Sequence, residues 1–409
     1  MKKIILLTIA NSGISGVTRY IEAVSSELKH DPRYDVYVVE LLHPQCSMFC
    51  CEYNDSGLTK ITIPLPLNAS NIIEYEYFSE EYSSIVVDIL SGYFDSNDDI
   101  VLHINTLNCI SVATDFKTRF VNTKIITHLH CIPWKGLYAK HPDKFYKLYN
   151  KYYVEKSAKL IASEFATNHT EIASYNHADK IICVTQCASE FLQRVMDIDS
   201  SKITVIQNGM ADCYRKPIKT RSKTASSQFK LLYVGSVIPS KGVEYLLHAA
   251  KDLVDMGFNV ELLLAGTADK KFKNQLESDY SIKNIKFLGQ ISFDKLKKLY
   301  TSCDVGVLPS LQEQCSYAAI EMAMFSMPII VTAVDGLDEM FNDGVDCLKV
   351  QTVFKDDVLA VDVSDLTNKI KQLITDIKLR EALSSNARKR YLANFTSELM
   401  VTKTNIIYL

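Results

Sequence analysis

The 409-residue sequence predicts an α/β protein with two doubly wound domains, each built on a largely parallel sheet. Short apolar runs alternate with segments of helical periodicity along the chain. The length exceeds what one hydrophobic core usually organises, and a hydrophobic content of 47% is ample for two cores. A polar, basic break at residues 215–228 separates two halves that show the same alternation.

The first unit combines an apolar run at residues 4–10, a glycine-bearing turn and an amphipathic helix. We interpret the run as a buried strand and not as a signal peptide, because it is short and continues into the turn without a cleavage site. Gly13 and Gly16 would let a ligand approach the backbone there. Their G-x-x-G spacing is not the dinucleotide fingerprint, so a nicotinamide cofactor is not indicated; a turn without a ligand is the alternative.

Four further strand-like runs follow in the first half, namely DVYVVEL, KITIPLPL, DIVLHIN and KIITHLH. His128 and His130 end the last run, and we expect them to point to opposite faces of the strand, so that only one faces a given site. His130 is our candidate because it lies at the strand's end, and a core or capping histidine is the alternative. The tyrosine-rich helical pattern at 137–179 fits packing as well as an acceptor groove.

The basic break has linker composition, with five Lys and Arg side chains among serines and threonines. A patch for an anionic membrane surface is the other interpretation of these charges. We therefore place the first domain at residues 1–212 and the second at residues 213–392.

The second half restarts the alternation in FKLLYVGSVIPSKGVEYLLHAAKDLVD. Gly235 ends the strand, and Lys241 with Gly242 opens the helix. A lysine beside a helix start suits a diphosphate, because the ammonium and the free amides are both positive there. Gly266 and Gly289 end the next two strand-like runs, VELLLAG and IKFLG.

Residues 304–346 are the most informative stretch, because they predict a strand, a loop, a helix of about three turns and a second strand. In a parallel sheet, this order puts the loop 311–316 at the carboxyl edge, where such sheets bind ligands. Amides at the helix start would suit a phosphate. Glu313 and Glu321 bracket the loop and helix, and carboxylates suit the hydroxyl groups of a ligand. Two solvated carboxylates would explain the spacing equally well.

The segment EQCSYAAIEMAMFSMP resembles the E-x7-E motif of retaining glycosyltransferases with the GT-B fold, whose usual form is E-x-F-G-x-x-x-x-E-A-M-A-x-G-x-P. Cys315 and Ser316 replace the Phe-Gly pair, and Ser326 replaces the last glycine. The strand-end loop with Lys241 resembles the family's G-R-x-x-x-x-K-G, with Ser236 in place of the arginine. The resemblance covers nearly the whole chain, including the segments at 335–339 and 342–344, and its specific motifs lie mainly in the second half.

The resemblance implies two Rossmann-like domains that face each other across a cleft, an acceptor-side domain first and a donor-binding domain second. It implies that a last helix, about residues 393–409, packs back on the first domain. It also implies a retaining, hexosyl-type transfer from a nucleotide diphosphate sugar, UDP- or GDP-linked, to a glycan, lipid-linked glycan or peptide. The family includes sucrose synthases and bacterial cell-envelope transferases.

The resemblance also assigns site residues. Lys241 would neutralise the leaving diphosphate, Glu313 would position the donor sugar, and Glu321 would hold the ribose hydroxyls. His130 would border the reacting face. The candidates for catalytic roles are thus Lys241, Glu313 and His130. Besides Lys241, Glu313 and Glu321, the candidates for binding the donor are Gly16, Gly235, Ser236, Gly266, Gln314, Cys315, Ser316 and Tyr317.

We expect transfer without a bound metal or cofactor, because the acidic pair Asp98-Asp99 precedes a strand and does not end one. Lys241 and helix amides would then take the place of Mg²⁺ at the diphosphate. Eleven cysteines without a C-x-x-C pair indicate free thiols in a reducing compartment. A metal site at the cluster of Cys46, Cys50 and Cys51 would need further ligands from elsewhere.

The net charge of −3 gives no footprint for nucleic acid. No run approaches the roughly eighteen apolar residues of a membrane helix, so we expect a cytoplasmic protein, with peripheral contact at the inner face of the membrane as an addition.

The serine at position 236 supports a second hypothesis, because it removes one of two cations expected at the diphosphate. The chain would then be a non-catalytic GT-B subunit that pairs with an active transferase. A nucleotide-sugar epimerase of the same fold is a third hypothesis, which the E-x7-E arrangement with its K-G loop disfavours. Nucleotide binding separates the first two, since a scaffold should show none.

Overall fold

The computed structural model of the chain describes most of its residues. The described ranges are 1–10, 15–43, 50–54, 58–64, 80–106, 109–132, 138–144, 147, 167–214, 228–280 and 284–409. Three predicted features lie outside them: Gly13, Cys46, and the linker from 215 to 227. The part of the tyrosine-rich segment at 148–166 also lies outside them.

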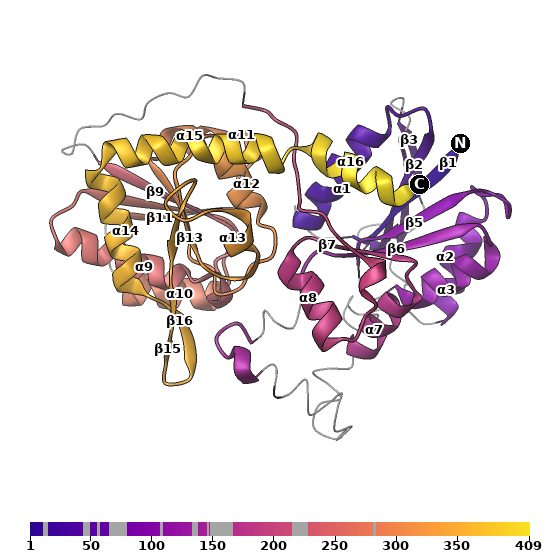
Figure 1. Cartoon of the computed structure of the whole chain (residues 1–409), viewed down its shortest axis with the longest axis horizontal. Coiled ribbons are helices and arrows are strands. Elements are labelled where there is room, and N and C mark those ends of the chain that lie inside the picture. Colours follow the sequence, from indigo (N-terminus) through magenta and orange to yellow (C-terminus); the bar gives the residue numbers. More distant parts are fainter. Residues whose placement is uncertain are drawn as a thin grey trace. The chain divides into compact units, whose positions relative to one another are not determined.

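The chain forms two compact units, each with one large and mainly parallel sheet, which confirms the predicted α/β class (Figure 1). Unit 1 comprises residues 1–131, 150–211 and 397–409, and unit 2 comprises residues 132–149 and 212–396. The segment 132–149, which the sequence analysis placed in the first domain, therefore groups with unit 2.

Within the described residues, unit 1 has an eight-stranded sheet in the order β3-β4-β2-β1-β5-β6-β7-β8. All neighbours are parallel except the antiparallel pair β3–β4. The central strand β1 is a run of wholly buried aliphatic side chains, as expected for a sheet with helices on both faces. The strands are β1 (Lys2–Ile9), β2 (Tyr34–His43), β3 (Cys50–Asn54), β4 (Leu58–Pro64), β5 (Ile100–Ile104), β6 (Thr123–Leu129), β7 (Lys180–Cys183) and β8 (Ile203–Val205). The helices are α1 (Gly16–Leu28), α2 (Glu80–Leu90), α3 (Ile110–Arg119), α7 (Thr167–His177), α8 (Gln186–Val195), the 3₁₀ turn η2 (Ser200–Lys202) and α16 (Ser397–Tyr408).

The helix α16 follows all of unit 2 in the chain but belongs to unit 1, where it contacts α1 (Figure 1). Two lysines from the sheet hold its last turn. Lys2 Nζ donates to the carbonyl oxygen of Tyr408 at 2.8 Å, and Lys124 Nζ donates to that of Ile407 at 2.6 Å. These cations satisfy carbonyl groups that a helix end leaves open and complement the negative end of the helix dipole.

Unit 2 has a six-stranded, wholly parallel sheet in the order β11-β10-β9-β12-β13-β14 and a separate hairpin, β15–β16, which extends away from the sheet (Figure 1). The strands are β9 (Phe229–Val234), β10 (Val260–Ala265), β11 (Ile285–Gly289), β12 (Val305–Leu308), β13 (Ile329–Thr332), β14 (Leu348–Val350), β15 (Thr352–Lys355) and β16 (Val358–Val361). The helices are the 3₁₀ turn η3 (Pro239–Lys241), α9 (Val243–Asp255), α10 (Lys270–Asp279), α11 (Phe293–Ser302), α12 (Tyr317–Met324), α13 (Asp335–Met340), α14 (Val363–Thr375) and α15 (Ile377–Asn394).

The strand order of unit 2 reverses between β9 and β12. From β9 the chain proceeds outward through β10 to β11, and from β12 it proceeds in the other direction through β13 to β14. The loops that follow β9 and β12 therefore diverge at the carboxyl edge of the sheet, and this topological switch point is where open α/β sheets bind ligands. No helix in the described part of the chain is long and apolar enough to cross a membrane.

Candidate functional site

The loop after β9 is fixed against its neighbours by backbone contacts that require glycine at two positions. Gly242 has a φ of +65°, and a Cβ there would lie 1.9 Å from the carbonyl oxygen of Pro309, which follows β12. Gly266 has a φ of +151°, and a Cβ there would lie 1.9 Å from the carbonyl oxygen of Gly235. Any side chain at these positions would push the loops apart. The predicted glycines therefore keep the loops after β9, β10 and β12 in close contact.

Lys241 and Glu313 meet where the loops after β9 and β12 touch. Lys241 Nζ donates to Glu313 Oε2 at 2.6 Å, and the two side chains are 25% and 20% exposed. The backbone joins the same loops, because Leu311 N donates to the carbonyl oxygen of Ser240 at 2.9 Å. The structure thus brings together two residues that the sequence analysis proposed separately, at the switch point of the sheet.

Tyr233 lies near the end of β9, the strand that leads to the Lys241 loop. Its hydroxyl donates to the carbonyl oxygen of Ser236 at 2.7 Å and supports the turn that follows the strand. Burial, and then the negative charge of Glu313, raise the pKa of this phenol. Ser236 itself is exposed, so the position that carries an arginine in the family's motif points a small polar side chain toward solvent.

The loop from Glu313 to the start of α12 is ordered by its own hydrogen bonds. The carbonyl oxygen of Glu313 accepts from Gly336 N at 3.0 Å. Ser316 caps α12, since its Oγ accepts from Ala319 N at 3.4 Å. Of the other predicted donor-binding residues here, Gln314, Cys315 and Tyr317 are buried. The loop therefore exposes few side chains, and a ligand would meet the side chain of Glu313 and the backbone.

Glu321 lies in different surroundings from Glu313. Its side chain is wholly buried, and its carboxylate accepts a hydrogen bond from the hydroxyl of Tyr300, which is itself wholly buried on α11. The ribose contact of Glu321 stays a prediction, and the structure adds Tyr300 as the residue that holds this carboxylate. The sequence analysis missed Tyr300, because a tyrosine in an amphipathic helix carries no local sign of a partner in another helix.

Unit 1 contains a cluster of three histidines at the carboxyl ends of β5 and β6, in which His103 and His128 are buried and His130 is half-buried. The rings of His128 and His130 stack with centroids 3.9 Å apart, so the expectation that they point to opposite faces is wrong. Residues two apart on a strand share a face, which explains the stacking. His103 shares hydrogen bonds with His128 at 3.2 Å and with the hydroxyl of Tyr408 at 2.7 Å. His130 Nε2 contacts Asn105 Oδ1 at 3.0 Å.

Burial keeps these imidazoles neutral. Burial lowers the pKa of His103 to about 3, with a smaller contribution from His130, and burial also lowers the pKa of His130 to about 3. The pKa of His128 is likewise well below its usual value, chiefly because of burial. His130 can thus offer a neutral ring to a neighbouring group but not a positive charge near neutral pH. Its place at the reacting face stays a prediction, as does the role of Gly16, which begins α1 after the capping residue Ser15.

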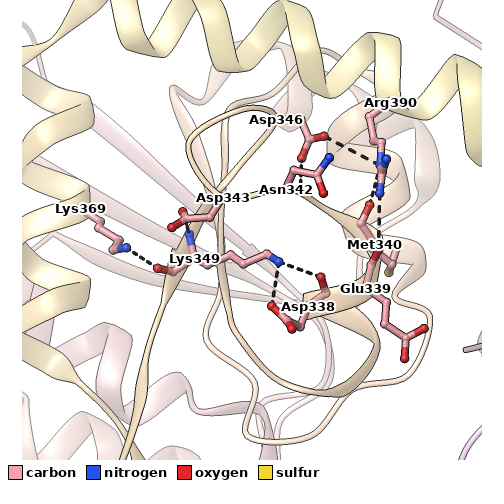
Figure 2. A network of polar contacts seen from close by, with 9 residues as sticks. All are labelled: Asp338, Glu339, Met340, Asn342, Asp343, Asp346, Lys349, Lys369 and Arg390. Atoms are coloured by element: carbon pink, nitrogen blue, oxygen red, sulfur yellow. Dashed lines mark hydrogen bonds and ion pairs between the residues drawn. The ribbon is translucent and has the colours of Figure 1, made fainter. Parts of the chain in front are cut away.

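A polar network holds the chain between α13 and β14 (Figure 2). Lys349 Nζ donates to Asp338 Oδ1 at 2.7 Å, and Lys349 N donates to Asp343 Oδ1 at 2.7 Å. Arg390 Nε donates to the carbonyl oxygen of Met340 at 2.8 Å, and Asp346 accepts from Asn342 N at 2.7 Å. Lysine and arginine thus fix the region that contains the segments 335–339 and 342–344, and Gly336 of the first segment bonds to the Glu313 loop.

Across the ranges that the structure describes, no group of three or more histidine, cysteine, aspartate or glutamate side chains could hold a metal ion. Transfer without a metal stays a prediction, to be tested by chelation.

Two family models match the chain in succession. One, described as Glycosyltransferase Family 4, matches residues 14–211, and the other, described as Glycosyl transferases group 1, matches residues 215–390. An uncharacterized glycosyltransferase of Methanocaldococcus jannaschii is 30% identical over 57% of this chain and 60% of its own length. The capsular polysaccharide biosynthesis glycosyltransferase CapM of Staphylococcus aureus is 27% identical over 65% of this chain and 66% of its own length. Both matches span less than two thirds of the relative.

Solved structures share the fold over the whole chain. Sucrose-phosphate synthase from Thermosynechococcus elongatus superimposes with a TM-score of 0.75 at 20% identity, covering 100% of this chain and 98% of that one. Anabaena HepE, solved in complex with UDP-glucose, superimposes with a TM-score of 0.67 at 14% identity, covering 100% of both chains. The two-domain GT-B fold predicted from the sequence is therefore confirmed.

Proposed function

The chain belongs to the glycosyl transferases of group 1, and on that premise we propose that it transfers a sugar from a nucleotide diphosphate donor to an acceptor hydroxyl. The observation that carries the proposal is the contact of Lys241 with Glu313 at the switch point of unit 2. One side chain suits a diphosphate and the other suits sugar hydroxyls, and a nucleotide sugar offers both groups next to each other.

A uridine nucleotide is the donor we favour, with a guanosine nucleotide as the alternative. Anabaena HepE, which shares the fold, was solved with UDP and with UDP-glucose. Lys241 would face the diphosphate together with the amides at the start of α12, where the positive end of the helix dipole lies. Glu313 would face the sugar, and Glu321, held by Tyr300, would serve the ribose.

The transfer we propose retains the configuration of the sugar and uses no protein nucleophile. The bond from the anomeric carbon to the leaving phosphate breaks while the acceptor oxygen bonds to the same face of that carbon. The acceptor's proton moves to the oxygen of the leaving phosphate. Lys241 opposes the negative charge that grows on the diphosphate, which is a stabilisation strongest in the transition state.

The acceptor we propose is a glycan, a lipid-linked glycan or a peptide, reached from the cytoplasmic side of the membrane. CapM of Staphylococcus aureus, whose name places it in capsular polysaccharide biosynthesis, supports a role in building cell-envelope polysaccharide. Unit 1 would bind this acceptor, with His130 as a neutral neighbour of the reacting groups.

One observation favours a second candidate, a non-catalytic subunit of a transferase complex. Ser236 is exposed where the family's motif carries an arginine, so the diphosphate lacks that cation. Such a subunit would keep the fold without binding a nucleotide.

A thermal-shift experiment tests the proposal against this candidate. A nucleoside diphosphate that binds only the folded chain stabilises it by roughly 2.7 kcal/mol at a hundred times its dissociation constant. We expect one of UDP, GDP, ADP, CDP and dTDP to raise the melting temperature. If all five leave it unchanged at millimolar concentration, the donor site is wrong. With a binding donor in hand, proton NMR of the product would show whether the anomeric configuration is retained.

A further inference from the structure

Glu313 lies where it opposes the binding of any anion to Lys241. We propose that Glu313 makes the site prefer a nucleotide diphosphate that carries a sugar over the bare nucleoside diphosphate. This inference rests on the proposed function, because it assumes that Lys241 binds the diphosphate. Beyond positioning the sugar, the carboxylate would make the site bind the donor, a nucleotide sugar, in preference to the product, a nucleoside diphosphate.

The backbone fixes the two side chains near each other. The loop of Lys241 packs on Pro309 through Gly242, with no space for a Cβ between them. The same loop binds the Glu313 loop through Leu311, and Gly336 binds the carbonyl oxygen of Glu313 from the other side. The backbone therefore keeps the two side chains close enough to reach the same ligand, and side-chain rotations alone can open the salt bridge.

A bare nucleoside diphosphate gains little from this arrangement. It must compete with Glu313 for the ammonium, or share the ammonium and accept a like charge beside its phosphates. The hydroxyl of Tyr233 cannot replace the ammonium of Lys241 as a donor to Glu313, because its single proton is donated to the carbonyl oxygen of Ser236. The unfavourable interaction of the carboxylate with the anion is thus not compensated.

A nucleotide sugar compensates for the unfavourable interaction between Glu313 and the diphosphate. Its hydroxyl groups are donors, and a carboxylate accepts them in charge-assisted hydrogen bonds. Glu313 can then exchange the ammonium for the sugar, while Lys241 turns to the diphosphate. After transfer the sugar has left, the compensation ends, and the product is repelled. Because product release limits turnover in many enzymes, this repulsion would help the catalytic cycle.

Binding measurements on matched ligands test the inference. Isothermal titration would compare each nucleoside diphosphate among UDP, GDP, ADP, CDP and dTDP with its glucose conjugate. We expect Glu313→Gln to bind the preferred nucleoside diphosphate about tenfold more tightly than the wild type, a change of about 1.4 kcal/mol. We expect its affinity for the conjugate to stay equal or fall, so that the preference for the sugar-bearing ligand shrinks.

A nearby ion pair supplies the control. Lys140 Nζ contacts Glu244 Oε1 at 2.7 Å, with side chains 33% and 22% exposed, in the first turn of α9. Glu244→Gln removes one negative charge from the start of α9, three residues after Lys241, without releasing Lys241 from Glu313. We expect the affinity of this variant for nucleoside diphosphates to change by less than about twofold.

The outcomes separate the two proposals. If the wild type binds none of the five nucleoside diphosphates and none of their glucose conjugates, the proposed function fails. If the wild type binds one of them and Glu313→Gln binds it no more tightly, this inference is wrong and the proposed function stands. An equal gain in Glu244→Gln would also overturn it, because the effect would then be one of net charge. Melting curves check folding, and Glu313→Ala repeats the test if the glutamine variant is unstable.

Discussion

Acidification should destabilise unit 1 through its cluster of neutral histidines. In the folded chain the pKa of His103 and of His130 is about 3, whereas an imidazole in the unfolded chain titrates near its ordinary value of 6.5. Between these values the unfolded chain binds more protons than the folded one, so stability is full above about pH 6.5 and falls as the pH falls toward about 3. At about pH 5 each of these histidines should cost about 2 kcal/mol relative to neutral pH.

The loss from the two residues, about 4 kcal/mol at about pH 5, is a large part of the roughly 5 to 15 kcal/mol that stabilises a typical domain. Its measurement requires a signal from unit 1 alone. Urea unfolding followed by hydrogen exchange of peptides from β5 and β6, corrected for the pH dependence of intrinsic exchange, would report this unit. Peptides from β9 and β12 would report unit 2 as an internal reference.

Variants identify the groups responsible. His130→Gln keeps a side chain that can hydrogen-bond to Asn105 but does not titrate. The free energy of unfolding of this variant should therefore decrease less than that of the wild type as the pH is lowered from about 7 to about 5. His248→Gln is the control, because His248 lies exposed on α9 of unit 2. The histidines do not control the acid stability of unit 1 if its stability is the same at about pH 7 and about pH 5, or if His130→Gln keeps the wild-type pH dependence.

Three further predictions concern the proposed transfer, and steady-state kinetics with the identified donor measures each of them. Lys241→Ala should lower kcat by about a hundredfold or more, because the ammonium meets charge that grows in the transition state; wild-type turnover in this variant would contradict the placement of the site. Glu321→Ala should mainly raise KM, and Glu321→Gln should recover part of this loss. Tyr300→Phe should raise KM by a smaller factor and lower the melting temperature, because the buried carboxylate of Glu321 loses a hydrogen-bond donor. A fall in kcat alone would assign Glu321 another role. Chelation by EDTA should leave activity in place, and a complete loss that Mg²⁺ or Mn²⁺ restores would show that the transfer needs a metal.

The fold followed from local signals in the sequence. A few neighbouring residues are enough to recognise a buried aliphatic strand such as β1, or the helix start at Lys241 with its glycine. The E-x7-E segment supplied the family. These features placed Glu313 and Lys241 each at the carboxyl edge of a strand, and the structure puts both strands at the switch point.

The contacts across the site could not be predicted in this way. Lys241 and Glu313 are 72 residues apart, and their salt bridge exists because β9 and β12 are neighbours in the sheet. The strand order was not encoded in any single motif. The bond from Tyr300 to Glu321 likewise depends on how α11 packs on α12, so the burial of Glu321 was missed. The prediction for His128 and His130 was wrong for a different reason. Residues two apart on a strand point to the same face, and the prediction put them on opposite faces.

The position of α16 in the chain determines the order in which the two units can be completed during synthesis. Unit 2 ends at residue 396, whereas unit 1 still needs the helix that begins at Ser397. A nascent chain therefore carries the sheet of unit 1 without its last helix while the whole of unit 2 emerges, which reverses the usual order in which N-terminal domains are finished first. Lys2 has to wait for Tyr408, 406 residues later, before it gains its carbonyl partner. Translation through unit 2 is thus the interval in which the surface of unit 1 that α16 later covers is accessible to chaperones.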